Sequence, residues 1–463
     1  MPLGVAALAG LLVVVALGVV WLHRDVPETH ADILAEFKYG SIGTDQQAGI
    51  PYWIWRVLPL VFPEYLPDRP GEGYARLGFI YEPGSPDRPI GTSVRDSPIA
   101  RVGLNCAACH TGTVRDSPDS PAQIVYGMPA QGLNAEGYYR FLFAAARDPR
   151  FNSDVLLAAI RQVNPEFSWW EGLIYQYVAI PTTRAELLQM ADRLTWFDER
   201  PPFGPGRLDT SNWYKAALGL PIDDSVGSVD LPAIWNQRPR ESMAGEWDGS
   251  NTSLDERMRA GTIATGAAPD TLDEEAVQRV KDWIMDLQPP TFPREHIDAE
   301  RAQAGQPIFQ AHCAACHALD GAKIGQTTPA AEIGTDPERL GAFSDALAQA
   351  IDSPGHFHFH TTDGYLNMPL DGVWLRAPYL HNGSVPTLRD LLKPPEERPT
   401  SFVRGYDGYD YSAVGFISSG PRAERAGWRY DTRARGNGNQ GHTYGTDLSP
   451  ADKEALLEYL KTL

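Results

Sequence analysis

The four cysteines of this 463-residue chain occur as two pairs, and a histidine directly follows each pair. Both segments read C-A-A-C-H, at residues 106–110 and 313–317. This spacing is the attachment signature of c-type haem, in which two thiols bond to the two vinyl groups of one haem and the adjacent imidazole binds the iron. The sequence therefore predicts two covalently attached haem c groups. The six residues expected to hold them are Cys106, Cys109, His110, Cys313, Cys316 and His317.

Other uses of paired cysteines explain these segments less well. A thioredoxin-like redox pair, a split zinc site or structural thiols would each leave the histidine after both pairs without a role. The two pairs are also about 200 residues apart, whereas the two halves of a zinc site are usually much closer. With two haems attached, no cysteine is left for a disulfide. Because c-type haem is attached outside the cytoplasm, we expect the globular part in the periplasm or an equivalent space.

The composition limits the classes of partner. The chain has 59 acidic and 40 basic side chains, which gives a formal net charge of −19. This charge argues against nucleic acid, because phosphate binding needs a basic surface. It is compatible with a cationic redox partner protein that is steered by charge. The 43 glycines and 39 prolines predict many loops and short helices, and alternating strand patterns are rare, so we expect a mainly α fold.

The N-terminal region is strongly apolar. Residues 3–22 form an uncharged apolar run of 20 residues, and about 20 such residues can span the hydrocarbon core of a bilayer. We expect residues 1–24 to be an uncleaved single-pass anchor in the inner (cytoplasmic) membrane, with the soluble part in the periplasm. The alternatives are a cleaved export signal, whose usual basic start is absent here, and a buried helix. Residues 25–95 then form a connecting segment in which the four prolines of residues 50–67 predict an irregular wrap on the core or an aromatic collar at the membrane interface.

Two helices are predicted to close the haem-binding parts. Thr271 and Glu274 form a capping-box pattern before an apolar helical face that ends at Pro289. Near the C-terminus, Ser449 and Pro450 repeat a helix-start signal. A further helix at residues 299–310 would lead directly into the second C-x-x-C-H segment. We therefore predict a first haem c domain over residues 96–294 and a second over residues 295–463.

Residues 371–392 carry a more specific resemblance. Their core, A-P-Y-L-H-N-G-S at 377–384, resembles the signature of the bacterial dihaem cytochrome c peroxidase superfamily, which includes the MauG-type enzymes. The segments G-P-G-R-L-D-T at 204–210, W-D-G at 247–249 and G-H at 441–442 look closer to the rubber-oxygenase-like branch. The resemblance runs from about residue 40 to the C-terminus. It implies two tandem cytochrome c-like domains with long irregular loops and a redox function.

The resemblance also suggests the sixth iron ligand of the second haem. The peroxidases use a methionine shortly after the Pro-Tyr-x-His motif, but no methionine follows His381 here. MauG-type enzymes use a tyrosine, and the rubber-oxygenase branch uses a histidine near the C-terminus. His442 is the only histidine beyond His381, and it stands in a glycine-flanked loop, so we expect it to pair with His317 at the second iron. His381 is the alternative ligand, although the family implies a place for it near the haem edge.

The first haem has no obvious sixth ligand. The peroxidases carry a distal histidine a short way after the attachment motif, whereas this chain has no histidine between His110 and His296. Tyr126 and Met128 stand where such a ligand would fall. The first iron is therefore open, closed by Met128, or approached by a tyrosine or phenylalanine that does not coordinate it.

Other residues are assigned through the family or through general chemistry. A peroxidase needs a base to move the proton of peroxide, and the candidates near the first haem are Gln131 and Glu136. Guanidinium groups pair with haem propionates, for which the candidates are Arg207, Arg376 and Arg404. The family places a tryptophan between the haems, with Trp213, Trp235 and Trp247 as candidates. Dihaem peroxidases often hold calcium between domains, but no acidic loop here identifies such a site.

Two functions follow from these expectations. The first is an anchored dihaem redox enzyme that acts on peroxide or O₂ at the first haem, with the second haem as electron relay. The second is a non-catalytic electron carrier between a respiratory complex and a soluble partner. The peroxidase-type signature favours the enzyme, and the missing distal histidine argues against ordinary peroxidase mechanics.

Overall fold

A computed structural model of the chain describes residues 24–463, apart from residue 86 and residues 353–356. Helices are the main regular elements of this described part, which confirms the mainly α fold class. The strands are short, at two to four residues each, and they form one three-stranded sheet and several two-stranded ones. Long irregular connections join these elements, as the glycine and proline content predicted.

The membrane anchor expected over residues 1–24 is not supported. Across the described residues, no helix combines the length and the apolar character needed to cross a bilayer. The apolar run at residues 3–22 lies outside the described residues. We therefore correct two predictions, the N-terminal transmembrane helix and the single-pass location in the inner membrane, because both rested on that run.

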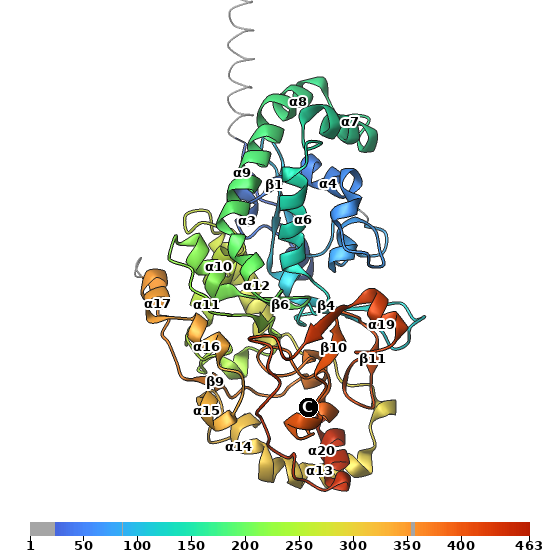
Figure 1. Ribbon diagram of the computed structural model, residues 1–463, viewed down its shortest axis with the longest axis vertical. Coiled ribbons are helices and arrows are strands. Elements are labelled where there is room, and N and C mark those ends of the chain that lie inside the picture. Colours follow the sequence, from blue (N-terminus) through green and yellow to red (C-terminus); the bar gives the residue numbers. More distant parts are fainter. Residues whose placement is uncertain (1–23, 86, 353–356) are drawn as a thin grey trace, which may run out of the picture.

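Helices from the N-terminal half of the chain build one end of the elongated molecule (Figure 1). Their apolar faces bury a core that includes Tyr138, Phe141 and Leu156. A π-helical turn at Tyr175–Ala179 joins the last two helices into one continuous rod. The helices of this end are α4 (Tyr52–Val61), α6 (Ala135–Arg147), α7 (Ser153–Val163), α8 (Trp169–Ile174) and α9 (Ile180–Arg193).

Within residues 50–67, α4 replaces the irregular wrap that four prolines predicted. Pro59 lacks the N–H that would bond to the carbonyl of Trp55 four residues earlier. The Tyr74 hydroxyl donates to that carbonyl instead, at 2.8 Å, and the Trp55 and Tyr74 rings stack at 4.4 Å. Trp55 is buried in the core, which argues against a membrane collar built from its ring.

A small antiparallel sheet leads the chain into the first C-x-x-C-H segment. Its strand order is β1-β3-β2, and its central strand ends two residues before the first cysteine. A second antiparallel pair, β4 and β5, begins directly after His110. In chain order, the elements are α2 (Ile33–Tyr39), α3 (Thr44–Gln47), β1 (Ile50–Pro51), β2 (Thr92–Arg95), β3 (Arg101–Leu104), α5 (Cys106–Cys109), β4 (Thr111–Val114) and β5 (Gln123–Tyr126).

The helix predicted from the capping-box pattern exists, but it begins later than the pattern indicated. In α12 (Glu274–Asp286) the N-cap is Asp273, whose side chain accepts from the backbone N–H of Ala276. The Thr271 hydroxyl bonds instead to Ala268 in the preceding turn. The other elements between β5 and this helix are β6 (Arg207–Leu208), α10 (Thr210–Ala217), β7 (Val229–Asp230) and α11 (Leu254–Ala264).

Two crossed helices form the opposite end of the molecule (Figure 1). α13 (Ala299–His312) covers the predicted span 299–310, and α20 (Pro450–Leu460) begins after the predicted N-cap Ser449. The helices approach closely at Gly305, where an added Cβ would lie 1.9 Å from the carbonyl oxygen of Ala455. The close approach explains the glycine, because any larger residue would force the two helices apart.

Short elements connect these two helices. In chain order they are α14 (Ala314–His317), β8 (Thr327–Pro329), α15 (Ala330–Ile333), α16 (Glu338–Ala342), α17 (Asp345–Asp352), β9 (Gly364–Leu366), α18 (Leu388–Leu391), β10 (Ser401–Arg404), β11 (Tyr409–Asp410), β12 (Gly415–Phe416), α19 (Pro421–Ala426) and β13 (Trp428–Asp431). β8 pairs with β9, β10 with β13 and β11 with β12, all antiparallel.

The core at this end takes residues from both sides of the predicted domain boundary. Leu375, Leu456 and Leu457 are buried together with Met128 and Trp235 of the earlier part of the chain. The division into residues 96–294 and 295–463 therefore stays a prediction.

Candidate haem-binding segments

The first C-x-x-C-H segment is enclosed by the protein. Asn105 caps α5, because its side chain accepts from the backbone N–H of Ala107. Ala107 and Ala108, which separate the two cysteines, are 1% and 6% exposed. The packing here is tight, since a Cβ added at Gly91 would lie 2.3 Å from the Cα of Ala108. The turn between the two thiols is thus held inside the fold.

His110 is oriented by a backbone carbonyl. Its Nδ1 lies 2.9 Å from the carbonyl oxygen of Pro232. Burial lowers the pKa of His110 to about 4, so the ring is neutral at physiological pH. A neutral imidazole that donates its Nδ1–H to a carbonyl presents Nε2 to a metal, which is the usual second interaction of metal-bound histidine.

His317 in the second segment repeats this arrangement. Its Nδ1 lies 2.8 Å from the carbonyl oxygen of Met368, and burial lowers its pKa. The surroundings differ, however, because Ala315 between the two cysteines is exposed. Both C-x-x-C-H histidines are thus positioned alike, and the two segments differ in the exposure of the alanines between their cysteines.

His442 faces His317 across a gap of the right size for an iron atom. The ring centroids are 6.2 Å apart, with the ring planes inclined at 43°. A metal–imidazole bond is about 2.0–2.1 Å long, and the bonded nitrogen lies about 1.1 Å from the centre of its ring. Two imidazoles on opposite sides of one metal therefore have centroids about 6.3 Å apart. The His442 Nδ1 is buried and has no hydrogen-bond partner in the described structure. These residues fit a haem iron held between two imidazoles.

A strained loop fixes the position of His442. Gly441 and His442 both have positive φ, at 78° and 47°, and a Cβ at Gly441 would lie 2.4 Å from the carbonyl carbon of Gly334. The His442 N–H donates to the carbonyl of Ile333 at 2.9 Å. The buried Arg398 donates to the carbonyls of Gly441 and His442 at 2.8 and 3.2 Å. This glycine-flanked loop thus has the close packing that its sequence suggested.

His381, the alternative ligand, points elsewhere. Its ring stacks on Tyr365 at 3.9 Å, and its Nε2 lies 3.0 Å from the Tyr365 hydroxyl. Burial, followed by the charges of Arg207 and Arg339, lowers the pKa of His381 to about 3. The geometry therefore favours His442 over His381 as the partner of His317.

Met128 is fully buried in an apolar core that also contains Val114 and Trp235. The N–H of the preceding Gly127 donates to the His110 carbonyl at 2.8 Å, so the backbone here is tied to the first segment. Met128 thus has a packing role in the fold, which disfavours it as a ligand of the first iron.

Tyr126 has an alternative role in the fold. Its ring packs edge-on against Phe37 at 6.4 Å, and its hydroxyl donates to Glu82 at 3.4 Å. It belongs to a small apolar cluster that also contains Cys106 and Ala107. Tyr126 therefore lines the surroundings of the first segment, with its hydroxyl directed to Glu82.

The two candidate bases near the first segment differ in availability. Glu136 is buried, and its carboxylate accepts from Arg140 at 2.7 Å and from the N–H of Phe203 at 2.6 Å. Gln131 donates its side-chain amide to the Thr113 carbonyl at 2.7 Å, while its Oε1 is buried without a partner in the described structure. Gln131 thus keeps an unused polar atom near the first segment, whereas Glu136 is engaged in the fold.

Arg376 is the propionate candidate that lies near the second segment. Its side chain is 14% exposed and pairs with Asp371 at 3.3 Å, and its charge lowers the pKa of the nearby His317 after burial itself. Its Nη1 donates to the Pro369 carbonyl at 2.8 Å and its Nη2 to the Asp371 carbonyl, while its Nε has no partner in the described structure. The free Nε–H of a buried guanidinium fits an acidic group of the haem.

The other two arginine candidates have protein partners. Arg404 forms a buried ion pair with Asp230, at 2.6 Å. Arg207 donates to the side chain of Asn437 at 2.9 Å, and its Nε is buried without a partner in the described chain. Arg207 therefore keeps one donor for a ligand, and Arg404 is committed to Asp230.

Trp235 connects the two C-x-x-C-H histidines through hydrogen bonds. Its indole Nε1 donates to the carbonyl of Asp371 at 3.1 Å. Pro232, whose carbonyl bonds to His110, stands three residues before Trp235. Met368, whose carbonyl bonds to His317, stands three residues before Asp371. Trp247 also joins these two segments, because its indole donates to the Asp230 carbonyl at 2.8 Å and its own carbonyl accepts from the N–H of Leu366 at 2.9 Å. Trp213 lies off this line, since it packs on Tyr139.

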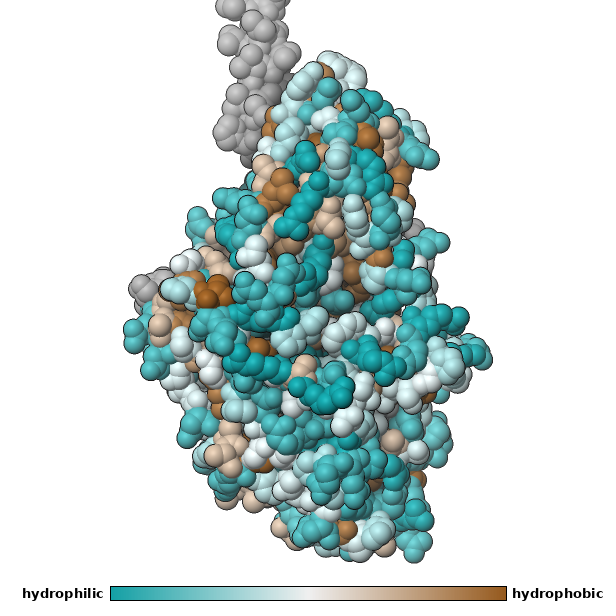
Figure 2. Space-filling view, in the orientation of Figure 1, coloured by the Kyte–Doolittle hydropathy of each residue, from teal (hydrophilic) through white to brown (hydrophobic). Residues whose placement is uncertain are grey.

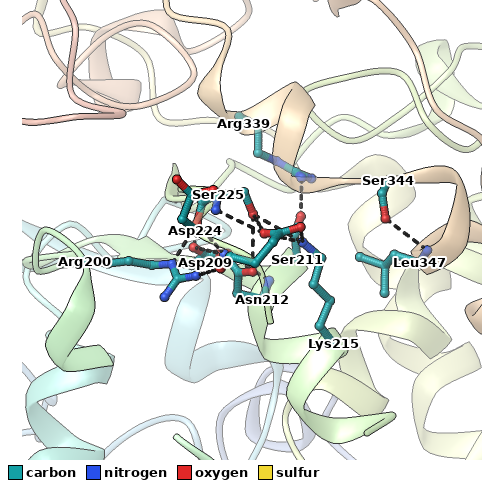
Figure 3. Close-up of polar contacts among 12 residues, drawn as sticks. Arg200, Asp209, Ser211, Asn212, Lys215, Asp224, Ser225, Arg339, Ser344 and Leu347 are labelled. Atoms are coloured by element: carbon teal, nitrogen blue, oxygen red, sulfur yellow. Dashed lines mark hydrogen bonds and ion pairs between the residues drawn. The ribbon is translucent and has the colours of Figure 1, made fainter. Parts of the chain in front are cut away.

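A buried polar network accounts for part of the segment at residues 204–210 in structural terms. Asp209 caps α10 by accepting from Asn212 at 3.0 Å, and it also accepts from the N–H of Gly227 at 2.9 Å. Figure 3 shows Arg339 of α16 reaching Ser211 at 2.6 Å and Arg200 lying beside the same network. These contacts tie α10 to the second half of the chain.

Several positioning groups could not be found from the sequence. The carbonyls of Pro232 and Met368 belong to the backbone, which carries no side-chain signal. Arg398 was missed because nothing near it in the chain marks a ligand loop. The calcium site stays unassigned, as no group of three or more His, Cys, Asp or Glu side chains is arranged to hold a metal ion within the residues described.

Two family models match parts of the second half of the chain. The family model described as "RoxA-like, cytochrome c-like" matches residues 364–403, and the cytochrome c model matches residues 302–371. Two uncharacterised proteins of Sinorhizobium fredii are similar to the chain. Protein y4iM is 31% identical over 285 residues, which is 50% of this chain and 64% of that protein. Protein y4iJ is 25% identical over 503 residues, covering 84% of this chain and 81% of that protein.

The matched spans contain the second C-x-x-C-H segment, Arg376 and His381. The chain spans a little under two thirds of the length of y4iM. The family models support one conclusion: the chain is a haem c-binding redox protein, a c-type cytochrome related to the RoxA-like proteins.

Proposed function

We propose that the protein is a dihaem redox enzyme in which the first haem takes up O₂ or peroxide and the second relays electrons. Both haems would be attached covalently, through Cys106 and Cys109 and through Cys313 and Cys316. When bound, each haem supplies one-electron chemistry at iron and, where a coordination position is vacant, uptake of a small ligand.

The observation that carries this proposal is an asymmetry between the two proximal histidines. His442 stands 6.2 Å from His317, at the spacing of a bis-imidazole site. Among the ring contacts of the described residues, this is the one between two histidines, and His110 has no such partner. Two imidazoles fill both axial positions of an iron, whereas one imidazole leaves a position for substrate. The second site therefore suits electron transfer and the first suits ligand uptake.

The protein would hold the two sites in electronic contact through Trp235. The path runs from the His110 ring to the Pro232 carbonyl, along the backbone to Trp235, across the 3.1 Å bond to Asp371, and back through Met368 to His317. Trp235 is fully buried, so water is kept away from this connection. A rigid, dry connection of this kind favours electron exchange between fixed sites.

Proton handling at the first site would fall to Gln131 or to bound water. Glu136 cannot serve as a base without giving up its bonds to Arg140 and Phe203. Gln131 can hold a water or a ligand through its unpaired Oε1 but cannot accept a full proton at physiological pH. This chemistry fits O₂ uptake better than peroxide cleavage, which needs a base.

The experiment that tests the proposal is CO binding by the reduced protein, followed by optical spectra. We expect one CO per chain, bound at the haem attached to His110. The alternative function is a non-catalytic electron carrier, and the engagement of Glu136 in the fold is the observation that favours it. A protein that binds no CO, and whose spectra do not respond to O₂ or peroxide, would be this carrier.

A further inference from the structure

A pocket of about 550 Å³ lies where three distant parts of the chain meet. One wall comes from β4 and β5, a second from the residues between α12 and α13, and a third from the C-terminal part. Small-molecule sites in proteins usually have volumes of about 300–1,000 Å³, so the pocket is large enough for such a ligand. Its aromatic and acidic lining residues are Asp116, Tyr126, Glu295, His296, Trp374 and Tyr411.

Three of the aromatic rings in this lining are held in fixed positions by the fold. The His296 and Tyr411 rings stack at 4.4 Å, with their planes inclined at 5°. The Trp374 ring lies 6.4 Å from the Tyr411 ring, and its indole Nε1 donates to the carbonyl of Pro290 at 2.9 Å. Trp374 is buried, whereas His296 is exposed. These rings therefore form an aromatic wall that runs from the core to the surface.

Two carboxylates give the pocket a negative charge. The Tyr411 hydroxyl donates to Asp116 at 2.5 Å, and Glu295 stands directly before His296. Burial raises the pKa of Tyr411, and the hydrogen bond to Asp116 and the charges of Asp116 and Glu295 raise it further. Both carboxylates thus act on the same tyrosine of the aromatic wall.

No lysine or arginine opposes these carboxylates among the described residues that line the pocket. Two nearby cations have carboxylate partners of their own. Lys461, which bonds to the His296 carbonyl, pairs with Glu458 at 2.6 Å. Arg115 pairs with Asp407 at 3.1 Å. The pocket therefore combines aromatic rings with unbalanced negative charge.

The pocket is separate from the large apolar surface of the molecule. That surface includes Trp169, Leu173 and Tyr177 in the continuous rod of α8 and α9 (Figure 1). On the face drawn in Figure 2, brown residues are frequent over this upper end, whereas teal and pale residues dominate over α13 and α20. Glu295 and His296 of the pocket stand shortly before α13, so the aromatic wall belongs to the polar end.

We infer that this pocket binds a small organic cation, a substituted ammonium ion with an apolar body. The faces of aromatic rings attract positive charge, and the two carboxylates would balance the charge of the ligand. The apolar body would contact Ile124, Val125 and Leu287, which also line the pocket. A neutral molecule would gain only this apolar contact, and both carboxylates would repel an anion. The formal charge of −19 on the chain further favours the approach of cations.

The ligand would contact both predicted haem c domains, because Tyr126 lies before the predicted boundary and Trp374 after it. Tyr126 also belongs to the apolar cluster that contains Cys106. Binding would therefore hold these parts of the chain together and stabilise the folded protein, whatever reaction the haems carry out.

The test measures the binding of benzyltrimethylammonium to the haem-loaded protein by isothermal titration calorimetry. Benzyl alcohol and benzoate are the matched ligands, because they keep the aromatic ring but replace the cation by a neutral group or by an anion. Glu295→Gln and Asp116→Asn each remove one negative charge from the pocket. Glu166→Gln is the control variant, since it removes an exposed carboxylate that follows α7, far from the pocket in Figure 1.

We expect a Kd for benzyltrimethylammonium that is about tenfold lower than the Kd for benzyl alcohol, and no binding of benzoate. Glu295→Gln and Asp116→Asn should each raise the Kd for the cation about fivefold, as expected for the loss of an exposed ion pair. Neither variant should change the binding of benzyl alcohol, and Glu166→Gln should stay within twofold of the parent protein. His296→Ala, which removes an exposed ring of the aromatic wall, should also weaken binding of the cation.

Three results would overturn the inference. The first is no measurable binding of benzyltrimethylammonium to the parent protein, and the second is equal affinity for this cation and for benzyl alcohol. The third is a Kd within twofold of the parent value in both Glu295→Gln and Asp116→Asn. CO uptake by the first haem is measured without any of these ligands, so failure of the enzyme proposal is observed separately.

Discussion

The same five-residue sequence, C-A-A-C-H, occurs twice in this chain and lies in two opposite environments. Around His110 the two alanines between the cysteines are buried, and the ring contacts of the described residues include no second imidazole against His110. Around His317 the segment reaches the surface, and His442 stands at the distance that two iron-bound imidazoles require. The attachment chemistry is thus set locally, whereas the openness of the iron is set by residues from distant parts of the chain.

The comparison suggests that the two sites have different functions. A closed, surface-near site is suited to exchange electrons with a protein, and an enclosed site with one imidazole is suited to take up a small molecule. Trp235 and the two carbonyl-bound histidines join the sites, so neither needs to perform both tasks.

The largest expected effect comes from removing one attachment. Replacing Cys106 and Cys109 with Ala should halve the covalent haem per chain, because the second segment shares no residue with the first. A pyridine haemochrome assay measures the haem content of the purified protein. The matched variant, with Cys313 and Cys316 replaced, should also halve it. An assay that still reports two haems per chain in either variant would show that attachment does not follow these segments.

The next effect sharpens the difference between the two irons. His442→Ala should convert the second haem from low spin to high spin and leave the first unchanged, because it removes one of two axial imidazoles. EPR of the oxidised protein measures both signals. His358→Ala is the control, since this exposed histidine pairs with Glu256 away from both segments. Unchanged spectra in His442→Ala would mean that another residue is the sixth ligand.

The connection between the sites predicts a moderate kinetic effect. Trp235→Phe keeps an aromatic ring but removes the donor to Asp371, and it should slow electron transfer between the haems about tenfold while changing the axial-ligand spectra little. Flash photolysis of the CO complex of the half-reduced protein measures this rate. Trp213→Phe, at a ring that packs on Tyr139 instead, should leave the rate within twofold. Equal slowing in both variants would move the path away from Trp235.

The smallest effect is expected at Met128. Met128→Leu conserves volume in a buried position and should cost less than about 1.5 kcal/mol of unfolding free energy. Because Met128 packs in the apolar core, the spectra of the first haem should not change. A new high-spin signal in this variant would identify Met128 as a ligand after all.

The two C-x-x-C-H segments could be predicted because their spacing is a local sequence signature. His442 was singled out because it is the only histidine of the sequence beyond His381, and its role as ligand stays a prediction. The packing role of Met128 could not be predicted, because its core neighbours Trp235 and Leu456 come from distant parts of the chain. The carbonyls of Pro232 and Met368 could not be predicted either, because every residue has a backbone carbonyl and the sequence does not mark these two.

The mainly α fold class was predicted correctly, but the bounds of some helices were not. The N-cap prediction was right at Ser449, where the cap residue and the proline after it both favour a helix start. The N-cap prediction was wrong at Thr271, because the side chain of Asp273, two residues later, caps the helix instead. α4 formed despite its prolines because Tyr74, nearly twenty residues away, supplies the missing donor. The apolar run at residues 3–22 suggested an anchor by length alone, and the described chain gives that interpretation no support.

The most direct test of the account is one pair of measurements on the unmodified protein: EPR of the oxidised form and CO binding by the reduced form. The account predicts one low-spin and one high-spin ferric haem, with a single CO bound per chain at the haem held by His110. Two low-spin haems with no CO uptake would contradict it and would leave the electron carrier as the function of this protein.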